Sequence, residues 1–453
     1  MKTYDAVEVE ALKKADVEHF LHPTSSITRL MERGPKIMAA GKGCKLYDVE
    51  GREYIDGTAG LWLSALGHGN AELAEAAREQ ILTLEYWTAF NEYSTVPTVK
   101  LAEKVASMVP IENAHVFLTS GGSETNDTVF KLVRYYFHNK GYKSKEIIIS
   151  RQRAYHGTTY GALSATKLPN FHEGFEPLLP GFDYVAVPYC YLCPFGKEYP
   201  GCGLECALDL ERKIQELGPD NVAAFVAEPI MGTGGVFVPP AGYFEKIREI
   251  CDRYEVLYVD DEVICGFGRT GKLFGILHWE ATPDIICLAK AITSGYVPLG
   301  AAVVSEKIFD VLKQKGTFPH GYTYSGHPVA CAVALKNIEI IERERLWENA
   351  ARMGGRLLNG IKERNLEAVG EVRGLGLMVG IDLVKDRATK EKFPTPLGAR
   401  VIEIAYENGL VCRCLAGDII QLSPPMIITA EEVDRIVEIV CDAIEKAYQE
   451  YTG

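Results

Sequence analysis

Three stretches of this sequence carry residue types that could do chemistry, and each directly follows a short apolar run. They are a glycine-rich turn at 119–124 (TSGGSE), three consecutive acids at 260–262 (DDE), and Lys290. Glycines that lead into a helix suit a phosphate, because the first backbone N–H groups of a helix have no partner within it. A carboxylate at a strand end can pair with a cationic ring, and a desolvated lysine amine can attack a carbonyl carbon.

Each feature also has a plainer explanation when it is taken alone. The turn could be an ordinary helix start capped by a serine. The acids could bind a metal, although no histidine lies near them in the sequence. Lys290 could be a surface residue whose apolar stem packs on its neighbours. Taken together, however, a phosphate cradle, a strand-end carboxylate and a strand-end lysine are what pyridoxal 5′-phosphate requires.

The middle of the chain alternates short apolar runs with helical patterns, which is typical of a mostly parallel sheet covered by helices on both faces. Helical spacing of apolar residues is clearest at 129–137 and 244–254. The predicted strands are Val116–Leu118, Ile147–Ile149, Ala223–Ala227, Val256–Val259, Ile285–Leu288 and Ala301–Val304. Ligands bind such sheets at the carboxyl edge, so the three stretches are expected to meet there.

Composition and charge exclude several classes of protein. The chain has 453 residues, of which 47% are hydrophobic and 24% are charged, as in ordinary globular proteins with a large core. Its net charge of −13 is spread along the chain, and no basic arm offers a footprint for nucleic acid or an anionic membrane. No apolar run approaches the ~18 residues of a membrane span, and no secretory leader is visible. We therefore expect a cytoplasmic protein without nucleic-acid or membrane partners.

Eight segments, in order along the chain, resemble motifs of the class III (ω-type) pyridoxal-phosphate aminotransferases. They are YIDGTAGLWLSALGHGN, TSGGSETND, AYHGTT, AEPIMGTGG, DEVICGFGRTG, AKAITSGYVPLGA, GYTYSGHP and GLVCRCLAGDIIQLSPP. The most specific is DEVICGFGRTG, followed by a lysine 29 residues after its aspartate. The resemblance covers nearly the whole chain.

The resemblance implies an α/β fold of the aspartate-aminotransferase type, which is fold type I. In that fold a large domain with a mostly parallel central sheet, here expected over residues 65–325, binds the cofactor. A small α+β domain is assembled from both chain ends, here 1–64 and 326–453. The sequence of the N-terminal part agrees, because CKLYDVEGREYIDG reads as a hairpin with its turn at Glu50 and Gly51.

The resemblance also implies roles for the residues around the cofactor ring. Lys290 would form the Schiff base with pyridoxal 5′-phosphate and, once displaced, would move a proton as general base and acid. Asp261 would pair with the pyridine nitrogen and keep the ring protonated. Val263 and Tyr155 would pack on the two ring faces, and Glu228 would lie near the cofactor.

Gly122 and Ser123 match the phosphate-binding pair of the family. The preceding residue is usually serine in the family but is Gly121 here, so one hydroxyl contact is lost. Thr323 matches a threonine that reaches the phosphate of the neighbouring subunit, which implies a homodimer or a dimer of dimers.

The resemblance implies a substrate class, because two residues that some members of the family carry are absent from this chain. Relatives that use 2-oxoglutarate carry an arginine where this chain has Thr158 and tend to carry a gating glutamate where it has Thr233. Amine–pyruvate and ω-amino-acid–pyruvate relatives instead carry an arginine matched by Arg413, which would bind the acceptor carboxylate. Trp62 would form a wall of the pocket. We therefore expect pyruvate as acceptor and an ω-amino acid or primary amine, such as β-alanine, taurine or a diamine, as donor.

Four of the twelve cysteines cluster with the spacing C-x2-C-x8-C-x3-C at positions 190, 193, 202 and 206. Such a cluster could hold zinc, form disulfides or remain as free thiols. No catalytic step above needs a metal, so no metal is predicted in the active site, and whether Cys190, Cys193, Cys202 and Cys206 bind one stays open.

Two other functions remain compatible with the sequence. An aminomutase or racemase on the same scaffold would keep Lys290 and Asp261 but would need no second substrate. A scaffold protein without catalysis would not need the intact set of cofactor residues. A dehydrogenase is weaker still, because the glycines at 232–235 lack the strand–GxGxxG–helix context of a dinucleotide site.

Overall fold

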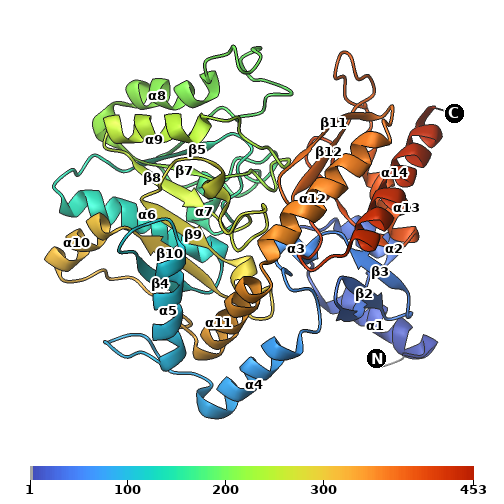
Figure 1. Cartoon of the computed structure of the whole chain (residues 1–453), viewed down its shortest axis with the longest axis horizontal. Coiled ribbons are helices and arrows are strands. Elements are labelled where there is room, and N and C mark those ends of the chain that lie inside the picture. Colours follow the sequence, from blue (N-terminus) through green and yellow to red (C-terminus); the bar gives the residue numbers. More distant parts are fainter. Residues whose placement is uncertain (1–3, 453) are drawn as a thin grey trace.

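The computed structural model describes residues 4–452 and contains a central sheet of seven strands (Figure 1). Their order is β4-β10-β9-β8-β7-β5-β6. The bounds are β4 His115–Thr119, β5 Ile147–Arg151, β6 Phe182–Val185, β7 Val222–Ala227, β8 Leu257–Asp261, β9 Ile285–Leu288 and β10 Gly300–Val304. Only β10 runs against its two neighbours. The prediction of a mostly parallel sheet is thus confirmed.

Both faces of the central sheet are covered because its strands are apolar on both sides. The face with Ile148, Val226 and Val259 packs against α6 (Gly122–Asn139), and α10 (Glu306–Lys315) lies beyond it. The opposite face packs against α8 (Glu205–Leu217) and α9 (Tyr243–Arg253). Further elements of this part are α4 Ala71–Leu84, α5 Val96–Met108, α7 Tyr160–Ala165, α11 Pro328–Arg343, η1 Pro219–Asn221, η2 Gly275–His278 and η3 Lys290–Ile292.

The two chain ends lie side by side, in blue and in orange to red in Figure 1. One terminal sheet has the order β1-β2-β3-β13 and joins the ends directly, since β13 pairs in parallel with β3. The other, hereafter the C-terminal sheet, has the order β11-β12-β15-β14.

The remaining bounds belong to these two ends. At the N-terminal end they are α1 Ala6–His19, α2 Ile27–Arg33, β1 Met38–Lys42, β2 Lys45–Asp48, β3 Glu53–Asp56 and α3 Ala59–Trp62. At the C-terminal end they are α12 Leu346–Glu363, β11 Val369–Gly374, β12 Val379–Leu383, α13 Gly398–Glu407, β13 Leu410–Val411, β14 Arg413–Leu415, β15 Ile419–Leu422 and α14 Ala430–Thr452.

The hairpin predicted around Glu50 and Gly51 is present, as the antiparallel pair β2 and β3. Within residues 4–452, no helix combines the length and the apolar character that crossing a membrane requires.

Candidate functional site

The carboxyl edge of the central sheet brings most of the predicted site residues together. Asp261 is the last residue of β8, Glu228 directly follows β7, and Lys290 lies two residues beyond β9. They line one cavity of about 110 Å³. Its lining residues are Gly122, Ser123, Asn126, Tyr155, His156, Gly157, Glu228, Asp261, Val263, Ile264 and Lys290.

Lys290 occupies this cavity in an unusual backbone conformation. Its φ of 51° lies in the left-handed region, which costs a residue with a side chain roughly 1 kcal/mol or more. Its amine forms no hydrogen bond or ion pair with any residue of the described range 4–452. Burial lowers the pKa of this amine, and the nearby carboxylates Asp261 and Glu228 oppose that shift only in part. A partly desolvated amine that lines a cavity and has no partner is available to react.

Asp261 is held by two side chains that the sequence reasoning did not single out. Its Oδ2 accepts hydrogen bonds from His156 Nδ1 at 2.7 Å and from Asn126 Nδ2 at 3.0 Å, and its Oδ1 accepts one from the Val263 N–H at 3.1 Å. The Asp261 side chain is only 2% exposed and that of His156 is fully buried. The carboxylate is therefore fixed in orientation before any ligand binds. Both residues stand inside recognised motifs, TSGGSETND and AYHGTT, which is the signal that could have identified them.

The two flanking acids face the other side of the sheet, because side chains alternate along a strand. Glu262 accepts hydrogen bonds from the N–H groups of Ile276 at 2.8 Å and Gly275 at 2.9 Å. Asp260 is fully buried, and no N–H or O–H among residues 4–452 donates to either of its oxygens. Burial and the neighbouring Glu262 raise the pKa of Asp260 far above its ordinary value. The proton of this carboxyl pair therefore stays on Asp260.

Replacing Asp260 with asparagine is expected to stabilise the fold by about 1–3 kcal/mol at pH 8 and by less at pH 5. The folded chain keeps a proton on Asp260 that the unfolded chain releases above about pH 4, so the wild-type group lowers stability as the pH rises. An asparagine has no such proton to lose. Denaturant unfolding at both pH values measures the difference, with exposed Asp220→Asn as the matched control. A stability gain that shrinks with rising pH would contradict the protonated state.

The N-terminus of α6 forms a cradle next to Asp261. The helix begins at Gly122, so its first backbone N–H groups have no partner within the helix. A side chain at Gly122 would begin 2.9 Å from Val263 Cγ1, and one at Gly157 would begin 2.5 Å from Ser123 Oγ. Ser123 Oγ accepts the Thr158 N–H at 3.2 Å. Only glycines leave room here, and the free N–H groups together with the helix dipole favour an anion.

Glu228 connects the cavity to a glycine-rich turn. Its Oε1 accepts the Tyr155 N–H at 3.2 Å, and its Oε2 accepts the Gly232 N–H at 2.9 Å. Burial raises the pKa of Glu228, with Asp261 adding to the shift. Tyr155 is half-buried beside it, and burial raises the pKa of its phenol.

Three predicted residues lie outside the cavity lining. Arg413 is the first residue of β14, and its guanidinium hydrogen-bonds to none of residues 4–452 although Tyr155 is near enough to act on its charge. Burial lowers the pKa of Arg413. Trp62 is 2% exposed and belongs to the same buried apolar cluster as Ile264, while its indole Nε1 has no partner within the described range. Thr323 is exposed, and its carbonyl accepts the Tyr86 hydroxyl at 2.8 Å.

The clustered cysteines are thiols in the structure. Cys190 is exposed and Cys206 is buried, and burial raises the pKa of the Cys206 thiol to about 12. In the described part of the chain, no three His, Cys, Asp or Glu residues are placed to hold a metal ion.

The donor set of the cavity fits a phosphorylated pyridine aldehyde. An unpaired amine at Lys290 matches the aldehyde, the fixed carboxylate of Asp261 matches a ring nitrogen that carries a proton, and the α6 N-terminus matches the phosphate. Val263 and Tyr155 line the same cavity, as expected of residues that sandwich a flat ring.

Comparisons with known proteins agree with this chemistry. Residues 31–444 match the family model described as aminotransferase class-III. The chain is 40% identical to the putrescine–pyruvate aminotransferase of Pseudomonas aeruginosa, over 95% of this chain and 94% of that protein. It is 39% identical to the diaminobutyrate–2-oxoglutarate transaminase of Halomonas elongata, over 91% of this chain and 90% of that protein.

One similar solved structure contains a form of the cofactor. The ω-transaminase from Pseudomonas jessenii in complex with PMP superposes with a TM-score of 0.94 at 41% identity, covering 97% of this chain and 98% of that one. These relatives share the fold of the pyridoxal-phosphate-dependent transaminases, fold type I. This chain is a member of the class-III aminotransferases, and its cofactor is pyridoxal 5′-phosphate.

Proposed function

We propose that this enzyme transfers the amino group of an ω-amino acid or primary amine, such as β-alanine, taurine or a diamine, to pyruvate in a ping-pong reaction. Donor and acceptor would use the same site in turn, and Lys290 would serve both half-reactions. The similarity to a putrescine–pyruvate aminotransferase supports this choice. Overall identity alone does not separate the acceptors, since a 2-oxoglutarate-dependent relative is nearly as similar.

The residues of the cavity have different roles in this reaction. When bound, pyridoxal 5′-phosphate supplies a ring that accepts electrons from the substrate carbon that loses its proton. Lys290 would take that proton from the substrate carbon and return it two atoms away, on the other side of the transferred nitrogen, and burial favours the neutral form of its amine. The Asp261 carboxylate holds a proton at the ring nitrogen, and His156 and Asn126 keep the carboxylate in place. Gly122 and Ser123 hold the phosphate.

Arg413 is the observation that carries the acceptor assignment. Its half-buried guanidinium has no carboxylate partner in the described chain, and it lies near Tyr155 of the cavity lining. Partial desolvation of a cation without a partner is unfavourable, and a substrate carboxylate would offset that cost with two parallel hydrogen bonds. Where relatives that use 2-oxoglutarate place a second arginine, this chain has the exposed Thr158. One arginine suits an acid with a single carboxylate.

Replacing Arg413 with leucine is expected to raise the KM for pyruvate about 10- to 100-fold, because a charge-assisted bidentate contact is lost. The KM for an amine donor without a carboxylate, such as putrescine, should change less than about threefold. Steady-state kinetics in both substrates measure this, with Arg435→Leu on the exposed face of α14 as the matched control. An unchanged KM for pyruvate would rule out Arg413 as the acceptor site.

A second copy of the chain is the proposed partner, and Thr323 would reach the phosphate held by that copy. Large exposed aromatic side chains support this interface: Trp87, Phe90, Tyr93 and Tyr324 are each 44–61% exposed. Tyr324 follows Thr323 directly, and the Tyr86 ring packs edge-on against the Tyr324 ring. Patches of this kind on a soluble chain are typical of interfaces. We further propose a homodimer or dimer of dimers that acts in the cytoplasm.

The proposed domains are a cofactor-binding part over 65–325 and a small domain from 1–64 and 326–453. The pairing of β13 with β3 supports a small domain built from both ends. At the second boundary, α11 packs along α4 and α5 and so contacts the larger part as well.

A further inference from the structure

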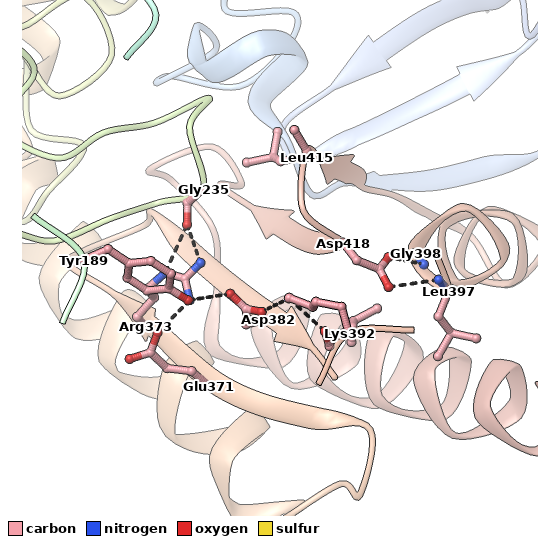
Figure 2. Close-up of polar contacts among 12 residues, drawn as sticks. Tyr189, Gly235, Glu371, Arg373, Asp382, Lys392, Leu397, Gly398, Leu415 and Asp418 are labelled. Atoms are coloured by element: carbon pink, nitrogen blue, oxygen red, sulfur yellow. Dashed lines mark hydrogen bonds and ion pairs between the residues drawn. The ribbon is translucent and has the colours of Figure 1, made fainter. Parts of the chain in front are cut away.

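Two arginines connect the central part of the molecule to the C-terminal sheet, and they cross in opposite directions. Arg373 on β11 reaches the glycine-rich turn of the central part, where its Nη2 donates to the Gly235 carbonyl at 2.7 Å (Figure 2). Its Nε donates to the Val236 carbonyl at 3.2 Å. Arg153, two residues after β5, reaches the other way: its Nη2 donates to the Ala416 carbonyl at 2.7 Å.

Both guanidinium groups lie against the same aromatic ring. The Cζ atom of Arg153 is 4.7 Å and that of Arg373 is 4.9 Å from the ring centroid of Phe237. Phe237 is fully buried. Arginine stacks well on aromatic rings because its charge is delocalised and weakly hydrated. The two arginines and the ring therefore form one packed unit across the junction.

Arg373 is fully paired within this junction. Its Nη1 lies 3.1 Å from Asp382 Oδ2 and 2.7 Å from Glu371 Oε2, and the Tyr189 hydroxyl donates to Asp382 Oδ2 at 2.6 Å. Lys392 bonds to the other oxygen of Asp382. Two cations and two carboxylates balance, as Figure 2 shows. A buried pair of this kind adds little net stability but fixes geometry, since moving one member leaves a charge unpaired.

The turn that Arg373 holds is itself tightly packed. Met231 and Phe237 exchange two backbone hydrogen bonds of 3.1 Å and close it. A side chain at Gly234 would begin 2.3 Å from the Arg153 carbonyl, and one at Gly235 would begin 2.8 Å from Ile419 Cδ1 on the C-terminal sheet. The N–H of Gly232 in this turn donates to the Glu228 carboxylate in the active-site cavity. A shift of the turn would therefore reach Glu228.

The turn that Arg153 holds directly follows the strand that begins with Arg413. Ala416 lies between β14, which begins with Arg413, and β15. On the far side of this turn, Asp418 accepts the N–H groups of Leu397 at 2.9 Å and Gly398 at 2.6 Å, at the start of α13 (Figure 2). The turn is thus held from two sides, by Arg153 and by α13.

We propose that Arg153 and Arg373 are positioning residues that fix the Arg413 strand and the Glu228 turn relative to each other, and so set the distance at which an acceptor carboxylate is held from the reacting atoms. This inference rests on the proposed role of Arg413 as the carboxylate-binding residue. Because a misplacement of about 1 Å can cost about 10²-fold in rate, a contact far from the reacting atoms can govern the acceptor half-reaction.

The test uses Arg153→Gln, which replaces the half-buried guanidinium with a shorter, neutral amide that does not span the distance to Ala416. Its KM for pyruvate should rise about 5- to 20-fold, while the KM for putrescine changes less than about twofold. Arg153→Lys should restore part of the loss, because it keeps the charge. Hydrogen exchange of the holoenzyme should be about tenfold faster at residues 413–419 and unchanged in β8 and β9. Arg373→Gln should accelerate exchange at 231–237 as well.

Arg413→Leu, measured in parallel, separates this inference from the proposed function. Suppose that Arg413→Leu raises the KM for pyruvate while Arg153→Gln changes neither this KM nor the hydrogen exchange at residues 413–419. The positioning role is then wrong and the acceptor assignment stands. If Arg413→Leu leaves the KM for pyruvate unchanged, the acceptor assignment fails. In that case hydrogen exchange in Arg153→Gln still tests whether the arginines hold the two turns in place. Faster exchange at residues 413–419 supports this, and unchanged exchange overturns it.

Discussion

Replacing Lys290 with alanine is expected to lower the rate of amino transfer by at least about 10³-fold, the largest effect of any single substitution in this chain. The Lys290 amine has no partner within residues 4–452, and burial lowers its pKa, so it is free to bind the cofactor and to move a proton. Among the residues that the structure describes, no other amine lines the cavity. The measurement is the kcat with putrescine and pyruvate, together with the rate of each half-reaction.

The matched control for Lys290→Ala is Lys143→Ala, at an exposed position in the loop before β5. It should keep wild-type rates. Loss of structure is checked by thermal unfolding. We expect the Lys290 variant to unfold no earlier than the wild type, since the substitution removes a desolvated amine without a partner and alanine tolerates the left-handed backbone conformation no worse than lysine. A Lys290→Ala enzyme within about tenfold of wild-type activity would exclude the proposed role of this residue.

Asp261→Asn is expected to reduce kcat about 10²- to 10⁴-fold while leaving the fold intact. The asparagine keeps an acceptor for His156 and Asn126, which donate at 2.7 and 3.0 Å to the wild-type carboxylate. It does not carry the negative charge that holds a proton at the ring nitrogen. Cofactor retention after gel filtration and the kcat of both half-reactions measure the effect.

Asp261→Glu provides the rescue and Asp220→Asn the control. The glutamate restores the charge, so it should recover at least about tenfold of the lost activity if charge is what matters. Asp220 is exposed, and its substitution should change nothing. Equal losses for Asp261→Asn and Asp261→Glu would indicate that packing, rather than charge, is the contribution of Asp261.

The ends of the central strands could be predicted from the sequence because the polar residues that end each apolar run are also the predicted site residues. Apolar runs that stop at Asp261 and shortly before Lys290 indicate both the strand and the edge where a ligand binds. The edge strand β6 (Phe182–Val185) was not predicted, since it is short, polar in part and less buried than the strands inside the sheet.

Contacts between distant segments could not be predicted from the sequence. Asn126 and His156 reach Asp261 across 135 and 105 residues of chain, and no local pattern indicates such a pairing. The same holds for Arg373, whose partners Gly235 and Val236 are more than a hundred residues away. Motifs identify which residues matter, whereas the fold decides which of them touch.

The most direct test of the account follows the absorption of the bound cofactor through one half-reaction at a time. Holoenzyme is mixed with putrescine, β-alanine or taurine, freed of the amine by gel filtration, and then given pyruvate or 2-oxoglutarate. We predict that at least one amine changes the visible absorption, that pyruvate restores it, and that 2-oxoglutarate does so at least about 10-fold more slowly. Restoration by 2-oxoglutarate alone would contradict the acceptor assignment and the role of Arg413, and absorption unchanged by every amine would contradict the donor class.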